Sequence, residues 1–201
     1  MPDFSFEVLE DGPVAGVDEA GRGALSGPVV AAAVIFRHPL KPCLLRRIDD
    51  SKRLKPSERN SLNSEIRKCG VIGIGAASVT EIEKVNILNA SMLAMRRAVL
   101  ALPELPILAL IDGNKSPDVP CRTRTLIKGD TLSVSIAAAS IIAKVARDRI
   151  MGLLSFRYPC YGWKQNAGYG TREHLAALKT MGVTGHHRRF FAPVNKILSR
   201  N

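Results

Sequence analysis

The stretch VAGVDEAGRGALSGPVVAAAVIF, residues 14–36, decides how this chain folds. It holds two apolar runs, residues 14–17 and residues 29–36, and each has the length and composition of a buried β-strand. The glycine-rich link GRGALSG joins them, and the first run ends directly in Asp18 and Glu19. The stretch therefore predicts two strands of a buried sheet, with two acidic residues where the first strand ends.

Further apolar runs and turn signals extend this sheet and add helices. Residues 71–79, 107–111 and 125–127 predict three more strands, and residues 56–68, 85–102, 137–154 and 174–181 predict helices. We expect an α/β fold with a core over residues 1–150 and a basic, mainly helical C-terminal extension over residues 151–201. The extension is expected to pack on the core in one structural domain. The 201 residues, 46% hydrophobic and 23% charged, exclude a mostly disordered chain.

The positive charge is concentrated in the second part of the chain. Lys and Arg number 29 against 18 for Asp and Glu, which gives a formal net charge of +11. Residues 112–201 hold 15 basic and 5 acidic residues, or +10, whereas residues 1–111 hold 14 and 13, or +1. A localised basic surface usually faces a polyanion. Nucleic acid is the leading candidate, and an anionic membrane surface is the second.

Cysteine usage and hydropathy indicate the compartment. No apolar run approaches the ~20 residues of a membrane helix, and the acidic N-terminus lacks the plan of a signal peptide. The sequence has four cysteines, Cys43, Cys69, Cys121 and Cys160. They are widely spaced and form no CxxC pair, which is typical of reduced thiols rather than of zinc ligands. We therefore expect a cytoplasmic protein that does not engage a membrane.

Acidic residues follow three of the predicted strands. The run VAGV is followed by Asp18 and Glu19, ILALI by Asp112, and TLIKG by Asp130. Sites in α/β folds gather beyond the carboxyl ends of strands, where converging carboxylates repel one another unless a divalent cation binds them. Carboxylates without an accompanying histidine suit Mg²⁺ or Mn²⁺ better than zinc. The alternative is that each acid merely caps a strand or turn.

Geometry restricts which acids can share one site. Neighbouring residues on a regular strand point to opposite faces, so Asp18 and Glu19 share a site only if the strand ends between or just after them. Asp148 lies 18 residues after Asp130, or ~27 Å along a helix, so the two are not expected to bind one metal. We favour Asp130, at a strand end, and expect Asp148 to pair with a neighbouring arginine.

Six blocks of this sequence resemble one known family. The blocks are VAGVDEAGRGALSGPVVAAAV, DDSKRL at 49–54, IDGN at 111–114, KGD followed by SIAAASIIAKVARD at 135–148, GYGTREH at 168–174 and GHHRRFFAPV at 185–194. In their order and from about residue 14 to residue 194, they resemble ribonuclease HII, the type 2 ribonuclease H. The whole acidic set of that family is present.

The resemblance implies a fold, an activity and a set of site residues. It implies a ribonuclease H-like mixed five-stranded sheet flanked by helices. It also implies hydrolysis of the RNA strand of RNA–DNA hybrids, and nicking of duplex DNA 5′ of an embedded ribonucleotide, with 3′-hydroxyl and 5′-phosphate products. The catalytic residues and ligands for Mg²⁺ or Mn²⁺ would be Asp18, Glu19, Asp112 and Asp130. We expect a monomer whose partners are hybrids and ribonucleotide-containing DNA.

The same resemblance implies how ribose is recognised. A protein distinguishes RNA from DNA at one position through the 2′-hydroxyl. The backbone of Gly21, Arg22 and Gly23 is expected to bind that hydroxyl, and Tyr169 in GYGT is expected to stack on a sugar. Ser51 and Lys52 in DDSKRL are expected to bind a phosphate.

Aromatic and basic residues are interleaved in the C-terminal extension. Trp163, Tyr161, Tyr158 and Tyr169 alternate with basic residues, a mixture that suits contact with a nucleic-acid backbone and some stacking. His186 and His187 are expected to serve packing or phosphate contact rather than metal binding. The competing functions are a ribonuclease HIII-like nuclease and a nucleic-acid-binding protein without catalysis. The short segment before the first strand argues against the former, and the complete acidic set against the latter.

Overall fold

A mixed five-stranded sheet forms the centre of the molecule. The structure, a computed structural model, describes residues 1–199. The strands are β1 (Val14–Ala20), β2 (Val29–Phe36), β3 (Gly70–Ala77), β4 (Leu108–Asp112) and β5 (Arg122–Leu126), in the order β3-β2-β1-β4-β5. β1 pairs antiparallel with β2 and β2 with β3, whereas β4 runs parallel to β1 and to β5. The predicted five-stranded mixed sheet is thus confirmed.

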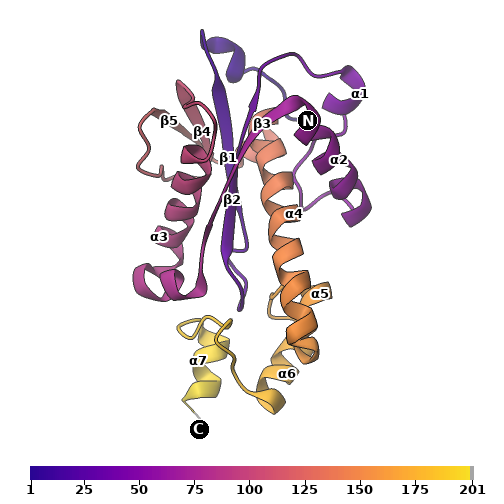
Figure 1. Ribbon diagram of the computed structural model, residues 1–201, viewed down its shortest axis with the longest axis vertical. Coiled ribbons are helices and arrows are strands. Elements are labelled where there is room, and N and C mark those ends of the chain that lie inside the picture. The colour runs from indigo at the N-terminus through magenta and orange to yellow at the C-terminus, as the bar shows by residue number, and fades with distance from the viewer. Residues whose placement is uncertain (200–201) are drawn as a thin grey trace.

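Helices cover both faces of this sheet. The α-helices are α1 (Pro42–Leu45), α2 (Pro56–Cys69), α3 (Val79–Leu100), α4 (Val134–Arg157), α5 (Trp163–Asn166), α6 (Arg172–Met181) and α7 (Ala192–Leu198). Short 3-10 turns lie at η1 (Glu7–Leu9), η2 (Gly129–Thr131) and η3 (Pro159–Tyr161). Figure 1 shows α3 on one side of the sheet and α4 with α2 on the other, while α5, α6 and α7 gather at one end of the molecule.

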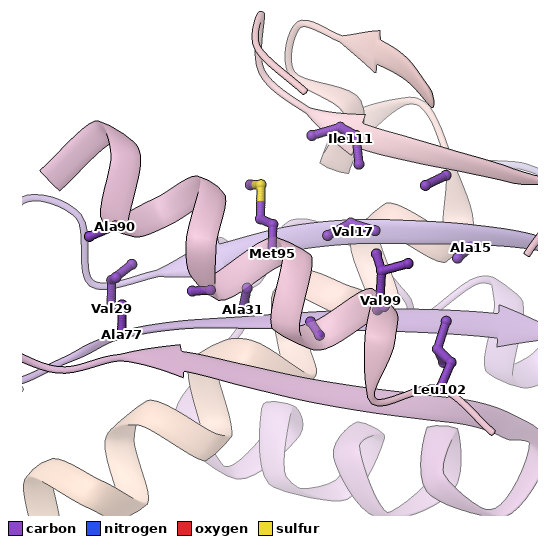
Figure 2. Packing of buried hydrophobic residues seen from close by; sticks show 14 of the residues in the cluster. Ala15, Val17, Val29, Ala31, Ala77, Ala90, Met95, Val99, Leu102 and Ile111 are labelled. Carbon is purple, nitrogen blue, oxygen red and sulfur yellow. The ribbon is translucent and has the colours of Figure 1, made fainter. Parts of the chain in front are cut away.

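Alternation along β2 divides the core into two layers. Ala31 and Ala33 pack with the α3 layer, where Met95 and Val99 lie against the sheet (Figure 2). Ala32 and Val34 point the other way, into the cluster formed with α2 and α4. Small side chains on strand and helix let the backbones approach closely, so α3 and α4 lie directly on the sheet.

Several elements are longer than the apolar pattern predicts. α3 begins at Val79 because Ser78 and Glu81 form a reciprocal capping box, and it contains a kink at Asn86, whose φ is 66°. α4 begins at Val134, where the Ser133 hydroxyl accepts a hydrogen bond from the Ile136 N–H. β5 includes four exposed residues at the sheet edge, which carry no apolar signal.

The C-terminal extension has its own apolar cluster. Trp163, Tyr161, Leu178 and Val194 pack with Met151 of α4 and with Leu25 of the glycine-rich link. α4 runs through residue 150 to Arg157, so the predicted division between core and extension falls inside one helix. The division of the chain into residues 1–150 and 151–201 stays a prediction.

Candidate active site

Three carboxylates meet where β1 and β4 end. Asp18, Asp112 and Asp130 each offer an oxygen that lies within 4.8 Å of the others. Asp18 is on β1 and Asp112 is the last residue of β4. Because Val17 lies opposite Ile111 in the parallel pair β1–β4, the residue after each reaches the same edge of the sheet. The convergence of these acids was predicted from the sequence and is confirmed, but the predicted end of the first strand at Val17 is wrong, because β1 extends beyond Asp18 to Ala20.

Asp130 reaches the cluster by a different route from the one predicted. It lies on the 3-10 turn η2 rather than at a strand end, because β5 has already ended at Leu126. Lys128, with a φ of 56°, turns the chain back, and the Gly129 N–H donates to the Asp112 carboxylate at 2.7 Å. This hydrogen bond ties the turn to β4 and places Asp130 beside Asp112.

Glu19 lies next to the three carboxylates rather than among them. β1 continues through Glu19 to Ala20, so the strand ends one residue after Glu19. The Glu19 carboxylate lies 3.3 Å from the Arg22 guanidinium, which is half exposed. Glu19 nevertheless lines the same cleft as Asp18 and Asp112. Its role as a fourth ligand stays a prediction.

Burial and mutual repulsion make this cluster unfavourable for several negative charges. Burial raises the pKa of the Asp18 carboxyl well above its ordinary value, and the charges of Glu19 and Asp112 raise it further. Burial, Asp112 and Asp50 likewise raise the pKa of Asp130, although Lys52 opposes them. A divalent cation would remove both penalties, and an all-oxygen donor set fits such an ion.

A cleft of about 540 Å³ opens beside the carboxylates. The tenth predicted site residue, Asp130, is buried beside Asp112. The other nine line the cleft: Asp18, Glu19, Gly21, Arg22, Gly23, Ser51, Lys52, Asp112 and Tyr169. Two further basic residues, Arg59 of α2 and Lys144 of α4, also line the cleft. They were missed because each looks in sequence like an ordinary charge on a helix surface.

Comparison with known proteins decides the family. The family described as Ribonuclease HII matches residues 15–194. Ribonuclease HII from Rhodospirillum rubrum is 53% identical over 204 residues, which cover 100% of this chain and 94% of that protein. The chain belongs to the ribonuclease HII family. It is an endoribonuclease that acts on RNA–DNA hybrids.

Solved structures agree with this assignment. The ribonuclease H2 from Pyrococcus horikoshii OT3 superposes with a TM-score of 0.77 and 26% identity, covering 94% of this chain and 98% of that one. A Bst ribonuclease HIII solved with Mn²⁺ gives a TM-score of 0.76 at 20% identity and shares the fold; this chain covers 70% of its length. The family match over residues 15–194 and the 53% identity to a ribonuclease HII favour this assignment over a ribonuclease HIII-like nuclease.

Among residues 1–199 of this ribonuclease HII, Lys52 is the cation that forms an ion pair with the acidic cluster. Its Nζ lies 3.4 Å from an Asp130 oxygen and 3.6 Å from Asp50. The pKa of Lys52 is raised above its ordinary value. Burial lowers it, but the negative charges of Asp50, Asp18 and Asp130 together outweigh burial. The neighbouring Ser51 is buried, and its backbone N–H donates to the Ser140 hydroxyl at 3.3 Å. The loop is thus anchored on α4 while the Lys52 side chain reaches the cluster.

Tyr169 lines the cleft, and its backbone is bound to a pair of buried histidines. Its backbone carbonyl accepts a hydrogen bond from His174 Nδ1 at 2.9 Å. His174 Nε2 lies 3.1 Å from His187 Nε2, and His187 Nδ1 accepts from the Thr184 N–H at 3.0 Å. His187 must therefore donate through Nε2, and both rings are neutral. Of the two roles expected for His187, packing or phosphate contact, the structure shows packing.

Two predictions about the remaining residues are wrong. Trp163 and Tyr161 do not face nucleic acid, because both are buried and Trp163 donates to His174 at 3.1 Å. Asp148 forms no ion pair with Arg147 or Arg149, its neighbours in sequence, and pairs instead with Lys144 and with an arginine of another helix. It binds Lys144 at 2.8 Å and lies 3.9 Å from Arg59 of α2. Asp148 stands outside the group of three carboxylates, as expected.

The helices and the cysteines agree with two expectations from the sequence. Within residues 1–199, the helices are too short or too polar to cross a membrane. All four cysteines are free thiols.

Proposed function

We propose that this ribonuclease HII cuts the RNA strand of RNA–DNA hybrids and also nicks duplex DNA on the 5′ side of a single embedded ribonucleotide. The products carry 3′-hydroxyl and 5′-phosphate ends. One observation supports this most strongly: the turn of Gly21, Arg22 and Gly23 lines the same cleft as Asp18 and Asp112. A group that reads the 2′-hydroxyl next to the scissile phosphate needs only one ribonucleotide.

The carboxylates supply the metal site of this proposal. Asp18, Glu19, Asp112 and Asp130 would hold Mg²⁺ or Mn²⁺, because oxygen donors without histidine or cysteine suit these ions. The Mn²⁺ found with the Bst ribonuclease HIII is consistent with this choice. When bound, the ion supplies an activated water and neutralises negative charge on the phosphate. The four carboxylates fix the position of the phosphate relative to the turn of residues 21–23, which is called the ribose-reading turn below.

Sugar recognition rests on the turn and on Tyr169. Within residues 1–199, no backbone or side-chain group accepts a hydrogen bond from the N–H of Arg22 or of Gly23. A Cβ placed on Gly23 would lie 3.9 Å from the Tyr169 ring, so the ring and the turn are neighbours. The two N–H groups would bind the ribose hydroxyl while the Tyr169 ring stacks on the adjoining sugar.

Basic groups around the cleft would hold phosphates. Ser51, Lys52 and Lys144 line the cleft, and the Lys52 Nζ lies 3.4 Å from an Asp130 oxygen. We propose that the substrate is a hybrid or a ribonucleotide-containing duplex, and that the protein acts as a monomer in the cytoplasm in the excision of ribonucleotides from DNA. The four free thiols support a reducing compartment.

A labelled duplex with one central ribonucleotide tests the proposal. Cleavage on the 5′ side is expected with Mg²⁺ or Mn²⁺ and none with EDTA. Tyr169→Ala should lower cleavage by about 100-fold through misplacement of the phosphate, while affinity for the hybrid falls less. Tyr169→Phe keeps the ring and serves as the matched control. Cutting confined to runs of several ribonucleotides would refute the single-ribonucleotide proposal.

A further inference from the structure

Two arginines are completely buried beneath the ribose-reading turn. Arg147 lies on α4, and Arg188 comes from the segment between α6 and α7. Both have an exposed fraction of 0%. Within residues 1–199 neither guanidinium forms an ion pair with a carboxylate. Burying an unpaired cation is costly, so these groups need a compensating role.

Arg188 binds three backbone carbonyls of the glycine-rich link. Its Nη2 donates to the Gly21 carbonyl at 2.8 Å, its Nη1 to the Arg22 carbonyl at 2.8 Å, and its Nε to the Gly27 carbonyl at 3.0 Å. The backbone N–H of Arg188 also donates to the Leu25 carbonyl at 2.8 Å. One residue from the C-terminal extension therefore holds both ends of the link.

Arg147 continues the same arrangement on the other side. Its three donors bind the carbonyls of Pro28, Ala167 and Ser26 at 2.8 to 3.0 Å. None of these carbonyls belongs to the turn of residues 21–23. The turn itself is thus held by Arg188, and Arg147 holds the segments on which the turn rests.

The direction of a peptide group makes the Arg188 contacts informative. In a trans peptide the C=O and the N–H of the next residue point in opposite directions, and residues 1–199 contain no cis peptide. The Gly21 carbonyl shares its peptide with the Arg22 N–H, and the Arg22 carbonyl with the Gly23 N–H. Since both carbonyls point at Arg188, both N–H groups point away from it, and Arg22 and Gly23 are both lining residues of the cleft.

We propose that Arg188 is a positioning residue for ribose recognition, which fixes two consecutive peptide groups so that the N–H groups of Arg22 and Gly23 converge on the sugar hydroxyl. The inference rests on the proposed reading of ribose by this turn. Two adjacent N–H groups held in this way form a concave donor site for an oxygen. The buried positive charge beneath them also favours the nearby phosphate.

The planar fork of arginine is essential to this role. Lysine carries one ammonium on a flexible stem and cannot hold three carbonyls in a fixed plane. Arg188→Lys therefore keeps the charge and removes the geometry. Arg189→Lys is the matched control, because Arg189 is the next residue and its side chain is exposed.

The experiment compares the affinities of two duplexes that differ by one 2′-hydroxyl. Binding of the full chain is measured in EDTA, so that no cleavage occurs. Wild type and Arg189→Lys should prefer the duplex with one ribonucleotide over the all-DNA duplex. In Arg188→Lys the ratio of the two affinities should fall about tenfold, as expected when the two hydrogen bonds from the N–H groups of Arg22 and Gly23 to the sugar hydroxyl are weakened. Its affinity for all-DNA duplex should stay within about twofold, since phosphate contacts are intact.

The outcomes separate this inference from the proposed function. If wild type binds both duplexes equally, the proposed reading of ribose is wrong. If wild type discriminates and folded Arg188→Lys discriminates equally, the positioning role is wrong. If Arg188→Lys does not fold, Arg188→Ala is measured with and without millimolar guanidinium chloride, and recovery of the preference with the ion supports the inference. Failure of both variants to fold would assign Arg188 to overall stability and overturn the positioning role.

Discussion

Asp112 is the residue on which the acidic cluster depends. Its charge raises the pKa of Asp18, of Glu19 and of Asp130, so it repels all three neighbours. Its carboxylate also accepts the hydrogen bond that holds η2. A single side chain therefore both orders the site and destabilises it when no cation is bound.

Asp112→Asn separates these two effects. The amide oxygen can still accept from the Gly129 N–H, so the fold should survive. Cleavage should fall by roughly 100-fold or more, because the metal supplies several kcal/mol of transition-state stabilisation. In EDTA, the melting temperature should rise slightly, since one repelling charge is gone. Activity assays and thermal melts with EDTA and with Mg²⁺ measure both.

Asp148→Asn is the matched control for this change. It removes a carboxylate of the same size that pairs with Lys144 outside the cluster. Most of the metal-dependent activity should remain. A folded Asp148→Asn enzyme that loses turnover, or an Asp112→Asn enzyme near wild-type turnover, would contradict the assignment of ligands.

His187 couples the stability of the molecule to pH. Burial and, after it, its neighbour His174 lower the pKa of His187 to about 4. An unfolded histidine titrates near 6.5. Between these values the unfolded state binds more protons, so this residue stabilises the fold fully above pH 6.5 and progressively less as pH falls toward 4. The loss is of the order of 3 kcal/mol at most.

Urea unfolding at pH 7.5 and pH 5 measures this contribution. The acidic cluster opposes it, since groups with raised pKa values favour the folded state as pH falls. The comparison is therefore made with His187→Gln, which should be less stable at pH 7.5 but lose less stability on acidification. Equal pH dependence in the two proteins would remove His187 from this role.

At the level of elements, the ends of strands were predictable and the turn that completes the site was not. The apolar runs of β1 and β4 each stop at an acid, and such a pattern is visible in the sequence, although β1 itself continues to Ala20. Asp130 depends on a left-handed Lys128 and on a hydrogen bond to Asp112, which join residues distant in sequence. Local sequence carries no signal for such contacts.

For the aromatic residues of the C-terminal extension, the sequence suggested contact with nucleic acid where the structure shows burial. Trp163 and Tyr161 alternate with basic residues in sequence, as in a nucleic-acid-binding segment, yet they form the core of the extension. Alternation along a chain does not say which side is buried when the segment consists of short helices and turns. The burial of Arg188 was equally unpredictable, because its partners are carbonyls some 160 residues away.

Gly16 controls how closely α4 approaches β1. A Cβ at Gly16 would lie 2.1 Å from the backbone of Ser135 and Ile136, in the first turn of α4. Gly16→Ala should therefore push this turn away and cost roughly 1 to 3 kcal/mol of unfolding free energy. Activity should fall as well, because η2 and Asp130 directly precede this turn. Urea unfolding and turnover measure the two effects.

Gly152, on the same helix, provides the control. A Cβ there would meet nothing within 4 Å. Gly152→Ala should leave turnover unchanged and gain up to about 1 kcal/mol from helix propensity. Destabilisation by both substitutions alike would show that helix flexibility, rather than close packing at Gly16, sets the stability.

For the whole molecule, the position of the basic residues matters more than their number. Residues 151–201 hold eight basic residues against one acidic residue, but Arg188 among them is buried and bound to carbonyls. Truncation after residue 151 would remove Arg188 and the Trp163 cluster together. Such a truncation would alter the ribose-reading turn as well as the charge, so it cannot isolate the contribution of the basic surface.

Neutralising exposed charges isolates that contribution. Lys164, Arg172 and Lys179 are exposed on the extension, and Lys164 lines a second cavity with Arg59 and Lys144, both of which also line the cleft. Each phosphate contact adds roughly 0.9 to the slope of log affinity against log salt concentration. Changing all three to Gln should lower that slope by up to about 3. The triple Gln variant of Lys41, Lys55 and Lys68 removes the same charge from exposed positions on the other part of the chain. If both variants flatten the slope equally, net charge governs binding, and a local basic surface on the extension is wrong.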